Sequence, residues 1–212
     1  MAAEDNQPKS RTPEFGESLR GLILPFLEDF PNTMAEEAID ALSRRFYPEE
    51  FQKNSHFVLP GEKGTRLGLI EDGIVRAYHS TPDGGEYTKT IFQEGHFLAP
   101  LASLTTKEPS PVGIQALTVV RLRVITYSDF ERLNREHHCL EHFTRMVIQW
   151  EWVRKEIREI RLVTLSAEER YELFLNEYPG LEHRIPWYYI ASFLGITPVA
   201  LSRIRRKKRE EA

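Results

Sequence analysis

The hydrophobic and polar positions change period along the chain, and each change marks a different kind of element. Apolar residues recur at helical spacing over residues 19–30 and 34–45, with a break at Pro31-Asn32, which predicts two short helices. Residues 44–126 hold short runs rich in Val, Ile, Phe, Tyr and Thr, which are typical of strands. From residue 128 onward the period is helical again. The sequence therefore predicts an α+β protein.

Glycine-containing turns separate the predicted strands. Asp72-Gly73 and Asp83-Gly84-Gly85 are the strongest hairpin signals, because glycine adopts the positive φ that tight hairpins require. Several short strands at this spacing predict an antiparallel jelly roll in the N-terminal part of the chain.

The first long helical segment carries apolar residues spaced alternately by four and three positions, with charged residues on both flanks. These residues are Cys139, Phe143, Met146, Trp150, Val153, Ile157 and Ile160. Such a seam is typical of helices that pair with a second copy, so we predict a dimerisation helix over residues 133–164. The alternative is an amphipathic helix that packs only on the core of its own chain.

Two further helical segments complete the chain. Ser166 and Glu169 form a capping box at the start of the first, which ends near Pro179-Gly180. In the second, Gly195 breaks the helical pattern, and Thr197-Pro198 is an N-cap followed by proline at the first helical position. The pattern predicts a helix-turn-helix, with a recognition helix over residues 198–206.

The recognition helix divides into an inward and an outward face. Leu201 and Ile204 point back to the core, and the outward residues have side chains suited to DNA. We expect base contacts from Val199, Ala200, Ser202 and Arg203. We expect phosphate contacts from Thr197, Arg205, Arg206, Lys207 and Lys208. We infer that the chain binds double-stranded DNA.

The charge distribution supports this inference although the average charge does not. The net charge is −4, but residues 184–212 hold seven basic against two acidic residues, a net of +5, which leaves −9 on residues 1–183. The basic residues thus gather where the helix-turn-helix is predicted.

The composition of the chain argues against disulfide-rich, secreted and membrane-spanning proteins. Hydrophobic residues make up 41% of the chain, enough for a packed core, and the single cysteine excludes an internal disulfide framework. Residues 1–15 are polar and lack a period, so we expect a disordered tail. The chain has no signal-peptide pattern and no membrane-length apolar run, so we expect a cytoplasmic protein.

In this order of elements the chain resembles the Crp/Fnr family of bacterial transcription regulators. IASFLGITPVALSRIRR looks like the helix-turn-helix signature of the family, and SHFVLPGEKGTRLGLIEDGIVRAY looks like its sensory fold. The resemblance implies a cyclic-nucleotide-binding-like roll over 16–132, the dimerisation helix, and a winged-helix-like domain over 165–212. It also implies a homodimer, a palindromic operator, and contact with RNA polymerase.

Two departures from the family pattern limit what the resemblance implies. Where the family holds a cyclic nucleotide with a Gly-Glu-Leu step and an Arg-Ser pair, this chain has Ala99-Pro100-Leu101 and Ser110-Pro111. An effector pocket would include Phe97, Ala99, Pro100, Leu101 and Ser110, but without the arginine we do not expect cAMP, and we expect no cofactor. Val199 replaces a glutamate common in relatives, which predicts a different operator.

Two other functions compete with a DNA-binding regulator. A cupin-like metal enzyme would use His56, His79 and His96, but these histidines lack a ligand spacing such as H-x-H, so we expect no enzyme activity and no metal. His137-His138-Cys139 is a second candidate for haem or redox chemistry. A sensor with the same roll but without DNA binding has no need of the basic C-terminal segment. The sequence leaves open whether a small-molecule effector binds, and which one.

Overall fold

The computed structural model describes residues 13–81 and 84–210, so most of the predicted tail and the Pro82-Asp83 turn lie outside the described residues. Three helical segments precede the strands: α1 (Pro13–Ile23), η1 (Leu24–Phe26) and α2 (Asn32–Ser43). They bury apolar faces, including Leu19, Ile39 and Leu42, against one end of the roll. A helix is therefore present in each of the two predicted ranges, with the break where Pro31 precedes α2. The first helix, however, ends at Ile23 instead of Phe30 and begins at Pro13, so residues 13–15 of the predicted tail are helical.

The strand region folds into two four-stranded antiparallel sheets, in the orders β1-β8-β3-β6 and β2-β7-β4-β5. The strands are β1 (Tyr47–Phe51), β2 (His56–Val58), β3 (Arg66–Asp72), β4 (Val75–Ser80), β5 (Glu86–Phe92), β6 (Phe97–Leu98), β7 (Gly113–Ala116) and β8 (Val120–Thr126). Residues such as Ile70, Leu98 and Val124 fill the space between the sheets. This is the predicted jelly roll.

Gly73 turns the chain between β3 and β4. Its φ is 104°, and a Cβ built there would lie 2.5 Å from the carbonyl oxygen of Val119, so only glycine fits without strain. The turn at Gly73 carries the chain from one sheet to the other, because β3 pairs with β6 and β8 whereas β4 pairs with β5 and β7. The hairpin predicted at Asp72-Gly73 is therefore wrong, although the tight glycine turn predicted there is present.

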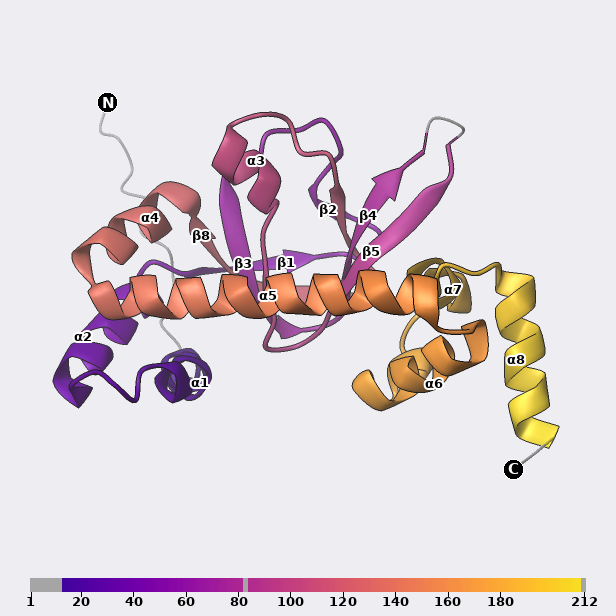
Figure 1. The fold of residues 1–212 in the computed structure, drawn as a ribbon. Helices are drawn as coiled ribbons and strands as arrows, with labels where there is room; N and C mark the ends of the chain where they lie inside the picture. Colours follow the sequence, from indigo (N-terminus) through magenta and orange to yellow (C-terminus); the bar gives the residue numbers. More distant parts are fainter. Residues whose placement is uncertain (1–12, 82–83, 211–212) are drawn as a thin grey trace.

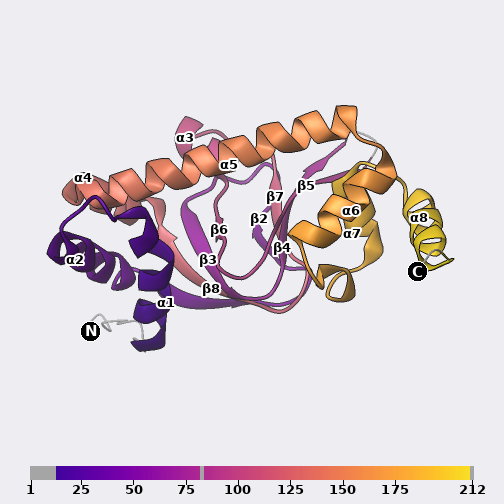
Figure 2. The same cartoon turned by 60° about the horizontal axis from the view of Figure 1, so that its bottom comes forward.

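The remaining helices are α3 (Leu101–Thr106), α4 (Tyr127–Glu136), α5 (His138–Thr164), α6 (Ala167–Glu177), η2 (Leu181–His183), α7 (Trp187–Leu194) and α8 (Pro198–Glu210). In Figure 1 the long α5 runs across the roll, with α1, α2 and α4 at one end and α6, α7 and α8 at the other. Figure 2 shows the same arrangement from a second direction. The described residues after β8 form no strand.

The later helices differ from the sequence-based prediction in two respects. The helix expected over 133–164 is divided at His137, whose φ of −126° and ψ of 100° are extended, so α5 begins at His138. The preceding α4 starts at the N-cap Thr126 and buries Leu133, so its packing is separate from that of α5. The helix α3 was not predicted, because six residues are too few to show a helical period.

The helices after α5 share their core with the roll. Phe174, Ile190 and Leu201 pack in one cluster with Ile74, Ile91 and Leu117 of the strand region. The predicted capping box is present at α6, where Ser166 Oγ accepts from Glu169 N at 3.2 Å and Glu169 accepts from Ser166 N at 2.8 Å. The helix-turn-helix is therefore fixed against the roll by a continuous apolar contact.

Candidate nucleic-acid interface and ligand cavity

The turn between α7 and α8 has the features predicted from Gly195 and Thr197. Gly195 is left-handed with φ 68°, and a Cβ there would lie 3.2 Å from Leu162. The hydroxyl oxygen of Thr197 accepts from Ala200 N at 3.1 Å, which caps α8. Because this oxygen is used in the cap, Thr197 has only its hydroxyl proton left for a phosphate.

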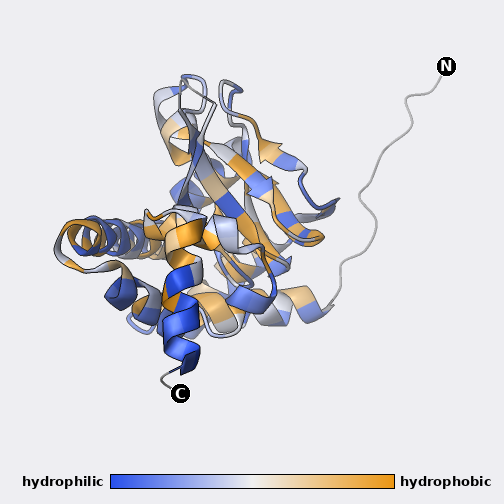
Figure 3. Ribbon diagram, turned by 90° about the vertical axis from the view of Figure 1, so that its right-hand side faces the viewer, coloured by the Kyte–Doolittle hydropathy of each residue, from blue (hydrophilic) through white to orange (hydrophobic). Residues whose placement is uncertain are grey.

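One face of α8 is buried and the other is open. Leu201 and Ile204 pack in the core, as predicted, whereas Val199 is 61% exposed, Ser202 and Arg203 are exposed, and Ala200 is half-buried. Arg203 takes part in no ion pair or hydrogen bond with the residues that the structure describes. Figure 3 shows the hydrophilic C-terminal half of α8 beyond its apolar first turns. The structure thus brings the four predicted base-reading residues together near the start of one helix.

The five predicted phosphate contacts are not equivalent. Lys207 is exposed, Arg206 lies 3.8 Å from Glu210, and Lys208 lies 3.8 Å from Glu172, so these cations stay at the surface.

Arg205 has different surroundings from those expected of a phosphate contact. Its guanidinium carbon lies 3.4 Å from the centre of the Trp187 ring, and its Nη2 lies 3.7 Å from Glu182. Glu182 also accepts from the hydroxyl of Tyr171 at 2.7 Å, and burial together with this bond raises the pKa of Tyr171 to about 12. In this conformation Arg205 joins α8 to α7 and η2. The sequence did not show this, because Trp187 and Glu182 belong to other elements.

The predicted dimer seam divides into a buried and an exposed part. Phe143 is only 3% exposed and packs edge-on against Phe26 and Phe97, and Cys139 is buried beside it. These two residues therefore serve the core of their own chain. Met146 is half-buried, but the rest of the seam is uncovered: Trp150 is 58% exposed, Ile160 is 55% exposed, and Val153 and Ile157 are also exposed.

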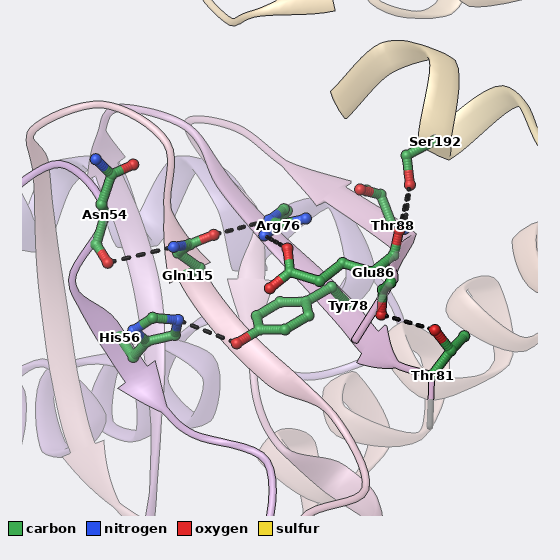
Figure 4. A network of polar contacts seen from close by, with 10 residues as sticks. Asn54, His56, Arg76, Tyr78, Thr81, Glu86, Thr88, Gln115 and Ser192 are labelled. Carbon is green, nitrogen blue, oxygen red and sulfur yellow. Dashed lines mark hydrogen bonds and ion pairs between the residues drawn. The ribbon is translucent and has the colours of Figure 1, made fainter. Parts of the chain in front are cut away.

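A polar contact that sequence reasoning missed joins α7 to the edge strand β5. Ser192 Oγ accepts from Thr88 N at 2.8 Å and donates to Glu86 O at 3.2 Å (Figure 4). Arg158 of α5 donates to the hydroxyl of Tyr87 and to Phe193 O, both at 2.7 Å. These bonds cover backbone groups that an edge strand otherwise leaves open.

Arg76 lies buried at the same contact. It is ion-paired with Glu86, donates to Gln115 at 2.9 Å, and lies 4.3 Å from the ring centres of Tyr78 and Tyr189 (Figure 4). A buried guanidinium requires such partners. No sequence signal marked it, since its partners are scattered over four elements.

An ion pair also links the roll to the segment that precedes α7. Arg184 donates to Glu94 at 3.0 Å, and Glu94 also accepts from Gly73 N at 2.9 Å. The bond from Arg184 is the largest cause that lowers the pKa of Glu94 to about 2.

A large cavity separates the roll from α5. Its volume is about 1090 Å³, and the predicted pocket residues Phe97, Ala99 and Leu101 line it. Pro100 and Ser110 do not. Pro100 is buried over Gly64, and Ser110 Oγ is buried and donates to Val112 O at 2.7 Å. Residues 97–113 place no charged side chain in the cavity wall.

The candidate metal and redox residues do not converge on one site. His56 is hydrogen-bonded to the hydroxyl of Tyr78 at 3.1 Å, and the described residues contain no group of three or more His, Cys, Asp or Glu placed to hold a metal ion. Burial raises the pKa of the Cys139 thiol. Among the described helices, none has the length and apolar character needed to cross a membrane.

Comparison with known proteins agrees with this architecture. Residues 48–137 match the model of the cyclic nucleotide-binding domain family. A search of curated proteins found no match. FixK2 from Bradyrhizobium japonicum is 17% identical with a TM-score of 0.69, covering 78% of this chain and 85% of that one.

Two further solved structures have the same fold. The c-di-GMP-responsive global regulator CLP of Xanthomonas campestris is 15% identical with a TM-score of 0.68, over 82% of this chain and 92% of that one. The Thermus thermophilus catabolite activator protein is 18% identical with a TM-score of 0.52, over 88% and 87%. Residues 48–137 are thus similar to the cyclic nucleotide-binding domain family, and the resemblance to Crp/Fnr regulators is confirmed in the fold of the chain.

Proposed function

We propose that this protein is a DNA-binding transcription regulator that acts as a homodimer and has no enzymatic activity. The observation that carries the proposal is the open face of α8. Val199, Ser202 and Arg203 are exposed near the helix start, and Arg203 has no partner among the described residues. A basic run follows on the same helix, which suits a helix lying in the major groove with phosphates on both sides.

The exposed stripe of α5 supports pairing with a second copy. Trp150, Val153, Ile157 and Ile160 are spaced by three and four positions, and an uncovered apolar row of this kind is stabilised when a partner helix buries it. A two-fold axis along α5 would present two α8 helices to the two halves of a palindromic operator. RNA polymerase is a further partner implied by the family resemblance.

The side chains of α8 also define what the operator contains. Arg203 can donate two bonds to O6 and N7 of a guanine, and Val199 can only make apolar contact, for instance with a thymine methyl. We further propose that cAMP does not control the protein through the binding mode of the family, because residues 97–113, where the family places its phosphate-binding arginine, provide no cation to the cavity.

Fluorescence anisotropy with a labelled random duplex tests DNA binding before any operator is known. We expect affinity that falls steeply as salt is raised, because bound phosphates release counterions. Replacing Lys207 and Lys208 with Gln lowers the affinity and flattens the slope, whereas the control Arg121→Ala, at a surface arginine of β8, leaves both unchanged. A protein that does not bind duplex DNA at low salt is a sensor, and the proposal is then wrong.

A further inference from the structure

The cavity between the roll and α5 lies away from the face of α5 that is left for pairing. Thr144, Ile148, Glu151 and Lys155 line the cavity and are spaced by four, three and four positions, which puts them on one side of the helix. Trp150, Val153 and Ile157 follow the same spacing on the other side. Pairing through the exposed stripe therefore leaves the cavity wall uncovered.

The body of the cavity is apolar. The roll contributes Leu67, Ala77, Phe92 and Val112, and α5 contributes Phe143, Val147 and Ile148. The volume of about 1090 Å³ exceeds the space that a drug-sized molecule occupies. Such walls stabilise an apolar molecule by removing its surface from water.

One end of the cavity holds two ammonium groups that lack partners. Lys89 of β5 and Lys155 of α5 both line it, and neither forms an ion pair or hydrogen bond with the described residues. Glu151, between them and the apolar body, is bound to Arg154 at 2.9 Å.

The surroundings of Lys89 are unfavourable for its charge. Burial is the largest cause that lowers its pKa, and Lys155 and Arg158 lower it further, against Glu159, which raises it. Glu159 offsets the cost of this half-buried charge only in part, and an anion bound at this point would reduce the cost that is left.

The other end of the cavity holds charges of both signs. Glu131, Arg135 and Glu141 line it there, and along α5 Glu141 precedes Lys155 by roughly 21 Å at 1.5 Å per residue. Because the two carboxylates at that end outnumber its one arginine, a ligand with a single negative group is better stabilised at the lysines.

We propose that the cavity binds an organic anion with an apolar body, its charged group between Lys89 and Lys155. An aliphatic carboxylate has this chemistry, whereas a cyclic nucleotide has no long apolar part to fill the body of the cavity. This inference goes beyond DNA binding and does not depend on it.

The position of the charged group connects the cavity to the helix-turn-helix. Lys89, Thr90, Glu151 and Lys155 also line a second cavity of about 690 Å³, whose walls include Arg158 of α5 and Phe193 of α7. Thr88, adjacent to Lys89, donates its backbone N–H to Ser192 Oγ. An anion bound at the lysines thus lies beside the contact that attaches α7 to β5.

Isothermal titration of the full-length protein with decanoate, decan-1-ol and cAMP tests the site. We expect one decanoate per chain, bound at least tenfold more tightly than decan-1-ol, which has the same apolar chain without the charge. In the Lys89→Gln, Lys155→Gln double variant, decanoate binding falls to the level of decan-1-ol, and decan-1-ol binding is unchanged. The exposed control Lys53→Gln keeps the wild-type ratio of decanoate affinity to decan-1-ol affinity.

A second variant tests the apolar body. Ala99→Phe fills part of the cavity and weakens both ligands, with thermal unfolding used to check that the variant is folded. Equal binding of decanoate and decan-1-ol, binding of neither, or an unchanged ratio in the double variant would overturn the proposal. So would stoichiometric cAMP binding that displaces decanoate. Anisotropy with random DNA on the same preparation, without decanoate, reports on DNA binding alone.

Discussion

Arg203 and Arg205 are two positions apart on α8 and have opposite surroundings. Arg203 is exposed and has no partner among the described residues, whereas Arg205 lies over the ring of Trp187 and beside Glu182. The sequence places both in one basic run, since a helical period alone does not show which arginine meets a ring from another element. The structure therefore separates a candidate reader of bases from a residue that holds the helix.

Alanine at these two positions has different expected effects. Arg203→Ala lowers operator binding by about 1–3 kcal/mol and leaves the unfolding temperature unchanged, because an exposed side chain is lost. Arg205→Ala lowers the unfolding temperature, since a cation–π contact of about 0.5–2 kcal/mol is removed. Anisotropy and thermal unfolding measure the two effects. Equal loss of stability in both variants contradicts the assignment.

The ion pair of Glu94 with Arg184 makes the free energy of unfolding depend on pH. Its pKa is lowered to about 2 in the folded protein, chiefly by Arg184, from an ordinary value of 4.5. A carboxyl whose folded pKa is depressed stabilises the protein above the unfolded pKa, and this contribution is lost as pH falls through the folded value.

Glu94→Gln should therefore lower the free energy of unfolding at pH 6, and the difference from wild type should shrink as pH is lowered from about 4.5 toward 2. Urea unfolding at several pH values measures this. The control Asp72→Asn, in a more exposed pair with Arg121 at 3.7 Å, gives a smaller difference at pH 6. A Glu94→Gln difference that does not change with pH would show that the ion pair with Arg184 adds no stability.

At the scale of elements, α5 presents two different sides. The stripe that includes Trp150 faces away from the chain, whereas Trp152 lines the cavity and is 70% exposed. Both tryptophans are exposed, but only Trp150 belongs to the proposed dimer seam. Substituting each in turn therefore distinguishes loss of the dimer from the loss of any exposed apolar side chain.

Trp150→Glu should convert a dimer into a monomer of 24.7 kDa, because a carboxylate in the seam would be buried without a partner. Trp152→Glu should keep the dimer. Light scattering after size-exclusion chromatography measures both masses. A wild type that is monomeric, or a Trp152→Glu variant that dissociates as Trp150→Glu does, contradicts pairing through this stripe.

Sequence periodicity predicted most elements but not their limits. The capping box at Ser166, the Gly195 turn and the buried face of α8 follow from local physics and are present. The break at His137 and the burial of Phe143 were not predictable, because both depend on how α4, η1 and β6 pack around the start of α5. Three of the five pocket residues predicted from the family comparison line the cavity, but its lysines come from β5 and α5, outside the segment that was compared.

At the scale of the whole molecule, the helix-turn-helix and the roll form one packed body. They share an apolar core and are joined by Ser192, Arg158 and the buried Arg76. None of these contacts follows from sequence period, since each joins residues from distant segments. Any effector that changes the position of β5 relative to α5 would therefore act directly on the helix-turn-helix.

Selection of binding sites from a random duplex pool by the full-length protein tests the central claim most directly. We predict a two-fold symmetric site with a guanine read by Arg203 in each half, and half-site centres about 10–10.5 base pairs apart or a multiple of this. The Arg203→Ala variant should lose preference at that one position in each half. A pool without enrichment, or a site without symmetry, would contradict a dimeric DNA-binding regulator.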